Sequence, residues 1–415
     1  MKKLLLATTI FLGAVTTSQA QDVETLDALE SGVASYTADF PQVSEEDARY
    51  ILGPELAAEF AEVQSCLLEN DNEHDPNFAG MHQRQRGKNF NVIVKFRNNA
   101  NKSLKECTNN RVFKAVGAAY SLDELEEAEL AVVQALELSD ISYGLTKDII
   151  RNRVIVEIEK ENFKEVSTIL KSVRQRNRSI RLRKGDSFFG ELSQITLLPD
   201  PRIYGNDIVS IPQLFGSAPR CTSGYSVIQN KTSHDSTAPN LLTGITTAGH
   251  CPNNVRVLGT SQTIQPPGEL DFQQNTDLQW HRNSTDEYAA RVISSASDPA
   301  RTQRIGWNVA RSVRVANIPM GKYTCKEGRI TGNTCGIYQG TTTSTNNLNN
   351  RSITSGIVLG MLGDNGDSGG PVFGYSLAGL EAYGTSSTIR RSSTSLTFTT
   401  VDSFDNLGLT ILTSP

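Results

Sequence analysis

The sequence predicts two unlike parts: a front part of mixed α and β structure over residues 21–200 and an all-β part over residues 201–415. In the front part, strand-like and helix-like patterns follow one another along the chain. Beyond about residue 198, short apolar runs are separated by clusters of Gly, Ser, Thr and Asn, which is typical of an all-β domain with many turns. A length of 415 residues also favours two or three folded units over one.

The first twenty residues have the pattern of a secretory signal peptide. Two lysines precede an apolar run over residues 4–15, and Ser18 and Ala20 occupy the small-residue positions expected before a cleavage site. The run is too short to span a bilayer, and no later apolar run is long enough. We therefore expect a secreted protein that does not bind a membrane and that, with a net charge of −5, does not bind nucleic acid.

The front part shows a regular succession of elements after the signal segment. Strand, helix, strand, helix and strand patterns occur at residues 91–96, 122–136, 152–159, 162–173 and 179–183. This order predicts a small α/β unit. The basic stretch at residues 171–184 overlaps the last helix and strand, where charges usually form a solvated face, so it is weak evidence for nucleic acid.

The six cysteines are expected to form disulfides, since an exported chain meets an oxidising environment. No Cys-x-x-Cys pair points to a zinc site, and we expect neither a metal nor a cofactor. If neighbours pair, the bridges are Cys66–Cys107, Cys221–Cys251 and Cys325–Cys335. The sequence alone allows three pairings for the last four cysteines.

Two motifs in the β part carry residues suited to acyl transfer. TTAGHC (246–251) contains His250, and GDSGG (366–370) contains Ser368. Acyl transfer by a serine needs a histidine to take its proton, a carboxylate to orient the imidazole, and backbone N–H groups aimed at the developing oxyanion. Gly366 has no side chain, so its N–H can turn toward a substrate, and the N–H groups of Gly366 and Ser368 are the expected oxyanion hole.

Together with CTSGYSV (221–227), these motifs resemble those of chymotrypsin-fold serine proteases, especially the secreted bacterial branch typified by alpha-lytic protease and the streptogrisins. Residues 398–413 are similar to the closing helix and strand of that branch, and residues 141–170 are more loosely similar to its pro-region. The resemblance implies two antiparallel Greek-key β-barrels over residues 201–415. It also implies an α+β pro-region over residues 21–200 that assists folding, inhibits the protease and is then removed.

The family order of His, Asp and Ser places the catalytic aspartate between His250 and Ser368. Asp271 and Asp277 are both candidates. Asp277 is favoured because the family's aspartate precedes a short apolar strand that DLQW resembles. Its implied role is to orient His250 and stabilise the imidazolium. By the same resemblance, Asp367 forms an internal ion pair that holds the oxyanion loop, with a partner that the sequence does not reveal.

The resemblance also suggests a substrate pocket. Leu362, six residues before the serine, is implied to form the base of the pocket and to favour an apolar side chain before the scissile bond. Asp364 lies close by and leaves a basic preference open. The segment of Ala382, Tyr383 and Gly384 is implied to pair with the substrate backbone. No cysteine follows the serine, so the disulfide that braces this pocket in many relatives is missing.

The expected function is that of a secreted serine endopeptidase that is synthesised as a zymogen and acts on proteins or peptides through an acyl-enzyme intermediate. Its own pro-region is the expected intramolecular inhibitor, and the mature enzyme is expected to be a monomer. Cleavage is expected between about residues 198 and 203, in a Pro-rich linker. The alternative is an inactive homologue that serves as a secreted binding or adhesion module, and the intact His, Asp and Ser argue against it.

Overall fold

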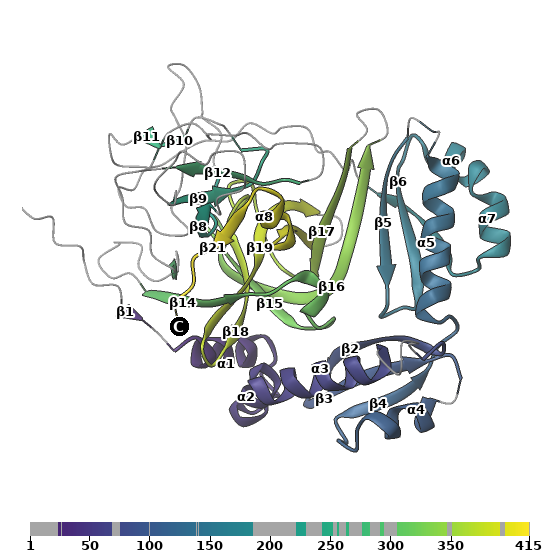
Figure 1. Cartoon of the computed structure of the whole chain (residues 1–415), viewed down its shortest axis with the longest axis horizontal. Coiled ribbons are helices and arrows are strands. Elements are labelled where there is room, and N and C mark those ends of the chain that lie inside the picture. The colour runs from purple at the N-terminus through teal and green to yellow at the C-terminus, as the bar shows by residue number, and fades with distance from the viewer. Residues whose placement is uncertain are drawn as a thin grey trace, which may run out of the picture.

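The computed structural model describes residues 24–25, 27–68, 75–98, 100–137, 139, 141–185, 221–229, 243–251, 255–256, 263–264, 276–282, 291–293, 305–346, 351–390 and 395–414. The signal segment, the expected cleavage region and Asp271 lie outside these residues. Figure 1 shows a β-rich body formed by the back part, with the helices and small sheets of the front part along two of its sides. No helix among the described residues is long and apolar enough to span a membrane.

The front part begins with three helices and a three-stranded sheet. Its elements are α1 (Ala28–Asp39), α2 (Glu45–Leu52), α3 (Pro54–Leu68), β2 (Phe78–Arg86), β3 (Asn89–Phe96), α4 (Ala100–Cys107) and β4 (Phe113–Gly117). The central strand β3 pairs antiparallel with β2 and parallel with β4. Side chains of α3 and the sheet form one apolar core, and the Cys66–Cys107 disulfide joins α3 to α4.

A second small unit follows in the front part. It contains α5 (Leu122–Leu136), β5 (Ser142–Asp148), β6 (Arg153–Glu159), α6 (Phe163–Ile169), α7 (Lys171–Arg176) and β7 (Ile180–Gly185). The sequence patterns predicted all of these elements except β5, and the expected last helix is divided into α6 and α7. Helix α5 begins at a capping box formed by Ser121 and Glu124, which satisfies free N–H groups of its first turn. The central strand β6 pairs antiparallel with β5 and parallel with β7.

The back part is mostly β, as predicted. Its elements are β8 (Ser226–Gln229), β9 (Thr243–Thr247), β10 (Val255–Arg256), β11 (Thr263–Ile264), β12 (Gln279–Arg282), β13 (Arg291–Ile293), β14 (Ile305–Ser312), a 3₁₀ turn (Val315–Asn317), β15 (Tyr323–Gly328), β16 (Gly332–Asn346), β17 (Arg351–Leu359), β18 (Pro371–Ser376), β19 (Gly379–Arg390), β20 (Ser395–Thr400), α8 (Asp402–Asn406) and β21 (Leu409–Ile411). Six strands close into an antiparallel ring in the order β15, β16, β17, β20, β19 and β18.

The described strands do not close a second barrel, so the expected pair of barrels stays a prediction. Strands β12, β9, β8 and β21 form an open four-stranded sheet, and β10 and β11 form a separate pair. The disulfides Cys221–Cys251 and Cys325–Cys335 complete the neighbour pairings considered from the sequence. The ring and the four-stranded sheet together place the ends of β9, β12 and β19 at one site.

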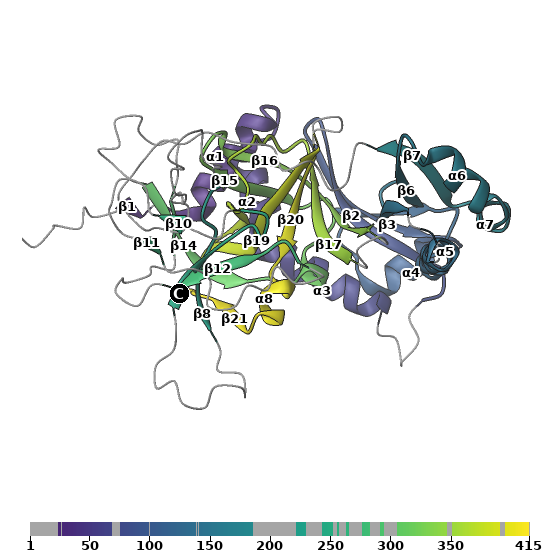
Figure 2. The ribbon, with the colours of Figure 1, turned by 90° about the horizontal axis from the view of Figure 1, so that it is seen from above.

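The front and back parts contact each other through several elements (Figures 1 and 2). Helix α1 packs on β18, and Trp307 Nε1 on the neighbouring part of β14 donates a hydrogen bond to Ser31 Oγ of α1 at 2.9 Å. Strand β5 pairs antiparallel with β16, so one sheet runs through both parts, and Thr146 donates a hydrogen bond to Thr342 across this pair at 2.8 Å. The short strand β1 (Glu24–Thr25) adds a parallel pairing with β14. The two parts therefore share both a sheet and an apolar core.

Candidate active site

His250 and Asp277 are hydrogen-bonded to each other, although they lie 27 residues apart in the sequence. Strands β9 and β12 pair antiparallel, which brings the turn after β9 beside the residues that precede β12. His250 Nδ1 lies 2.9 Å from Asp277 Oδ2 and 3.1 Å from Oδ1, and the backbone N–H of His250 donates to Oδ1 at 2.9 Å. The carboxylate therefore fixes both the ring and the backbone of His250.

A buried glutamine holds the turn that carries His250. Gln279 Nε2 donates hydrogen bonds to the carbonyl oxygens of Ala248 at 2.9 Å and Cys251 at 2.8 Å. The Cys221–Cys251 disulfide anchors the same turn to the residues that precede β8. Gln279 was not predicted as part of the site, because a glutamine on a strand gives no sign of this contact until β9 and β12 are paired.

The electrostatics of the pair favour an ionised aspartate. Asp277 is only 7% exposed, and burial raises its pKa. The charge of His250 and hydrogen bonds from His250 and Ser387 outweigh burial and lower the pKa of Asp277 to about 2. The Asp277 charge in turn raises the pKa of His250, against the opposing effect of burial. His250 is therefore a more basic imidazole than an exposed one.

Ser387 on β19 links Asp277 to Ser368. Its hydroxyl donates to Asp277 Oδ2, and its backbone carbonyl accepts a hydrogen bond from Ser368 Oγ at 3.4 Å. Thr399 on β20 also donates from its hydroxyl to the carbonyl oxygen of Asp277 at 2.9 Å. Ser387 and Thr399 were not predicted from the sequence, because they lie in Ser- and Thr-rich strands where nothing distinguishes them from their neighbours.

The loop before Ser368 is held by a buried ion pair. Lys326 Nζ lies 3.1 Å from Asp367 Oδ2, and both side chains are fully buried. Asp367 also accepts hydrogen bonds from Ile330 N at 2.8 Å, Asp364 N at 3.0 Å and Thr331 Oγ1 at 2.6 Å. Burial raises the pKa of Asp367, but the Lys326 charge and these donors outweigh burial and lower it. Lys326 is thus the partner that the sequence did not reveal.

Three glycines of this loop have conformations or contacts that require glycine. Gly366 and Gly369 have φ values of +107° and +88°, which side-chain-bearing residues rarely adopt. A Cβ on Gly370 would lie 2.2 Å from the carbonyl oxygen of Glu327. Within the described part of the chain, the N–H groups of Gly366 and Ser368 donate no hydrogen bond. Two adjacent donors are therefore available beside the Ser368 hydroxyl.

The expected pocket residues occupy positions that differ from the expectation. Leu362 is 61% exposed, unlike the covered floor of an apolar pocket. Ala382, Tyr383 and Gly384 lie in β19, with β18 along one edge and, along the other, the end of β14 beside Ala382 and the end of β20 beside Gly384. Both edges of this segment are occupied, so it cannot pair with a substrate backbone. The residues of β19 beside Ser368 are those around Ser387, five positions further along.

A metal site is not favoured by the groups around His250. Ligand atoms of Cys221, His250 and Cys251 lie within 4.8 Å of one another. The two sulfur atoms are joined in a disulfide, however, and the thiolate form that binds zinc is not available to them.

Comparison with known proteins gives structural similarities only. No protein-family model matches the chain, and no curated protein matches it. Among solved structures, the chain is similar to Thermobifida fusca protease A (25% identity, TM-score 0.37), a Nocardiopsis protease (19%, 0.37) and a Cellulomonas bogoriensis chymotrypsin (22%, 0.35). Each similarity covers 51% of this chain and 98–99% of the other chain. At TM-scores this low, the similarity carries no conclusion about this chain.

Proposed function

We propose that this protein is a secreted serine endopeptidase with His250, Asp277 and Ser368 as its catalytic residues. The observation that carries the proposal is the hydrogen-bonded chain from His250 through Asp277 and Ser387 to Ser368. It joins the histidine and serine motifs, which lie more than a hundred residues apart in the sequence, through a buried carboxylate. A purely structural role for these residues would not require an ionised aspartate behind an imidazole and two unused N–H donors beside a serine.

In the proposed reaction, His250 removes the proton from the Ser368 hydroxyl as Ser368 Oγ attacks the peptide carbonyl carbon. Asp277 accepts a hydrogen bond from Nδ1–H, so that Nε2 is the free base, and stabilises the imidazolium that forms. His250 then transfers the proton to the leaving amine, which gives an acyl-enzyme. Water hydrolyses the ester by the same proton transfers in reverse order.

The N–H groups of Gly366 and Ser368 would bind the oxyanion of the tetrahedral intermediate. Their orientation depends on the loop conformation, which Lys326 stabilises through Asp367. Loss of one oxyanion donor typically costs a factor of about 10²–10³ in kcat, so the geometry of this loop bears directly on rate.

The edge of β19 beyond Ser386 is the proposed platform for the substrate backbone. Strand β18 ends its pairing at Thr385, and the backbone of Ser386 is hydrogen-bonded to Gly369 and Gly370. From Ser387 to Arg390, β20 is the neighbour among the described strands, and it pairs with one edge only. A peptide added along the other edge would lie beside the Ser368 hydroxyl. The proposed preference for an apolar side chain before the scissile bond rests on Leu362, whose exposed side chain a substrate could cover.

Residues 21–200 are proposed to be a pro-region that is removed on maturation. Support comes from the contacts of the described front part with the back part: β5 extends the ring sheet at β16, and α1 covers apolar side chains of β18. A β-rich ring with many long-range pairings folds slowly, which gives such a segment a physical role as a folding template. Signal-dependent export and the position of the cut remain part of this proposal.

A fluorophosphonate probe tests the proposal directly. The mature protein should be labelled at Ser368, and Ser368→Ala and His250→Ala should abolish labelling, whereas Ser376→Ala, which changes a serine on β18 outside the site, should not. Absence of labelling in the folded wild-type protein would favour the inactive binding module. A Ser368→Ala chain that is processed normally would show that another protease removes the pro-region. Digestion of a peptide library then reports the preferred residue before the cut, and cleavage mainly after Lys or Arg would favour Asp364 over Leu362 as the specificity residue.

A further inference from the structure

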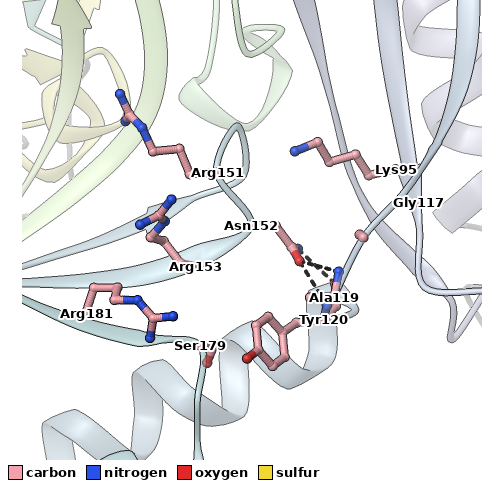
Figure 3. A pocket seen from close by; sticks show the side chains of 10 residues that line it. Lys95, Gly117, Ala119, Tyr120, Arg151, Asn152, Arg153, Ser179 and Arg181 are labelled. Atoms are coloured by element: carbon pink, nitrogen blue, oxygen red, sulfur yellow. Dashed lines mark hydrogen bonds between the residues drawn. The ribbon is translucent and has the colours of Figure 1, made fainter.

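A basic pocket lies in the front part, between its two small units. The pocket has a volume of about 400 Å³ and is lined by residues of β3, the segment after β4, the turn between β5 and β6, and the start of β7. Figure 3 shows Lys95 on one side of Asn152 and three arginines on the other. The pocket is formed entirely by the front part, so its role does not depend on the proposed catalytic function.

The charged side chains that line the pocket are all basic. They are Lys95, Arg151, Arg153 and Arg181, and no acidic residue lines it. Asp148 lies nearby and forms an ion pair with Arg151 at 3.0 Å. The Arg153 side chain makes no hydrogen bond or ion pair with any described residue. Within the same residues, the Arg181 side chain donates only to backbone carbonyl oxygens, those of Arg178 and Ile180. The pocket therefore has an excess of positive charge over the protein's own counter-charges.

The frame of the pocket is fixed by buried polar contacts. Asn152 has a φ of +53°, and its Oδ1 accepts hydrogen bonds from the N–H groups of Ala119 at 3.0 Å and Tyr120 at 2.9 Å. Lys95 Nζ donates to the carbonyl oxygens of Ile149 at 3.1 Å and Ile150 at 2.6 Å. Lys95 from the first unit is thereby held against the turn of the second unit that carries Arg151 and Asn152, where Asp148 supplies one counter-charge.

A buried hydroxyl adds an uncharged donor to the pocket. Ser179 is 2% exposed and lines the pocket directly before β7. Its hydroxyl makes no hydrogen bond within the described residues, so it remains available as a donor to a molecule in the pocket. Ser179 lies next to Arg153 in the sheet, because Val154 N donates to the Ser179 carbonyl at 3.2 Å. A ligand oxygen near Arg153 could therefore accept a hydrogen bond from Ser179 as well.

We propose that this pocket binds a small phosphate-bearing anion with two or more negative charges. Guanidinium groups donate paired hydrogen bonds to phosphate oxygens, and an ammonium and a hydroxyl supply further donors. The volume exceeds that of a single carboxylate and accommodates a diphosphate or a phosphate ester. Because the cations come from both small units, the bound anion would neutralise their repulsion and stabilise the packing of one unit on the other.

Calorimetric titration of the full-length Ser368→Ala chain with inorganic pyrophosphate tests the proposal. We expect saturable binding at physiological ionic strength, and a higher unfolding temperature when pyrophosphate is present. Arg153→Gln and Arg181→Gln should each weaken binding about tenfold or more, since each removes a charge-assisted contact. Ser179→Ala should weaken it less, by about fivefold. Arg176→Gln, which changes an exposed arginine of α7 that does not line the pocket, should leave the affinity unchanged.

Orthophosphate and a phosphomonoester are titrated in parallel, because they carry the same phosphate oxygens as pyrophosphate. Comparison of the three affinities identifies which phosphate compound fits the pocket. Circular dichroism of each variant checks that the chain remains folded. The proposal is wrong if none of these ligands gives saturable binding to the folded parent chain. It is also wrong if Arg176→Gln weakens binding as much as Arg153→Gln, since that would indicate attraction to the overall basic surface.

Discussion

Replacing one member of the buried Lys326–Asp367 pair should destabilise the back part almost as much as replacing both. Lys326→Met leaves the Asp367 carboxylate without its cation, and Asp367→Asn leaves the Lys326 ammonium without its anion. Breaking a fully buried ion pair in this way costs about 3–5 kcal/mol. Four donors, one each on Ile330 and Asp364 and two on Thr331, still contact the carboxylate in Lys326→Met, so we expect the lower end of that range, about 3 kcal/mol.

The double variant carries neither buried charge. Its cost should therefore be about 3–4 kcal/mol, well below the roughly 6 kcal/mol obtained by adding the single effects. The difference is a coupling free energy of about 2–3 kcal/mol between the two positions. Through this coupling, Lys326 on β15 stabilises the conformation of the loop that carries Ser368.

The assay is guanidinium unfolding of the full-length chain in a Ser368→Ala background, which prevents self-digestion. The two tryptophans, Trp280 and Trp307, both lie in the back part, so their fluorescence follows the unfolding of that part. Lys326→Arg serves as the matched control, because it keeps the charge, and it should lose less than Lys326→Met. Single effects that add to within about 0.5 kcal/mol would refute the coupling.

Three further predictions follow from single contacts. Asp277→Asn should lower kcat for peptide hydrolysis about 10⁴-fold, because an amide no longer selects the His250 tautomer with a free Nε2. A loss of kcat below tenfold would contradict this role of Asp277. His82 is 3% exposed, and burial, followed by the positive charges of Lys95 and Arg84, lowers its pKa from 6.5 to about 4. As the pH falls from 6.5 to 4, His82 therefore gains a proton in the unfolded chain before it does so in the folded protein. The contribution of neutral His82 to stability is complete above pH 6.5 and is lost as the pH falls through 4. Unfolding free energies of the wild-type chain should therefore decrease over this interval by up to about 3 kcal/mol, and His82→Gln should reduce that dependence on pH. Gly384→Ala should lower the denaturant midpoint without changing substrate preference. Its φ is +154°, and a Cβ at this position would lie 1.8 Å from the Thr399 carbonyl oxygen. A changed substrate preference with unchanged stability would instead indicate that Gly384 contacts the substrate.

Much of the front part was predictable from local patterns. The helix at 122–136 was predicted at its observed bounds, because its capping residue, strong helix formers and apolar spacing all lie within one continuous segment. Helices α1 to α3 were not among the predicted elements, although Asp27 and Ser44 cap the first two of them. Much of the apolar surface of α1 is buried against the back part, and a sequence pattern does not show a partner nearly three hundred residues away.

The segment of Ala382, Tyr383 and Gly384 shows why a motif can be recognised from the sequence while its neighbours in space cannot. Ser368 and Gly366 are recognisable because a tight loop restricts which residues its backbone accepts. Whether Ala382, Tyr383 and Gly384 have a free edge for a substrate depends instead on how far β14, β18 and β20 extend along β19. That extent is set by strand register and by irregularities in the pairing between β19 and its neighbours, which the residues of β19 alone do not specify.

The sequence by itself determined the residues whose requirements are local: the glycines of the loop at 363–370, the histidine and serine motifs, and the main elements of the second small unit. Only the tertiary structure decided which distant groups meet them. Lys326 reaches Asp367 across 41 positions, and Ser387 reaches Asp277 across 110. Such contacts depend on the pairing of strands into a sheet, and the free energy of that pairing is distributed over many residues, none of which carries a separate signal in the sequence.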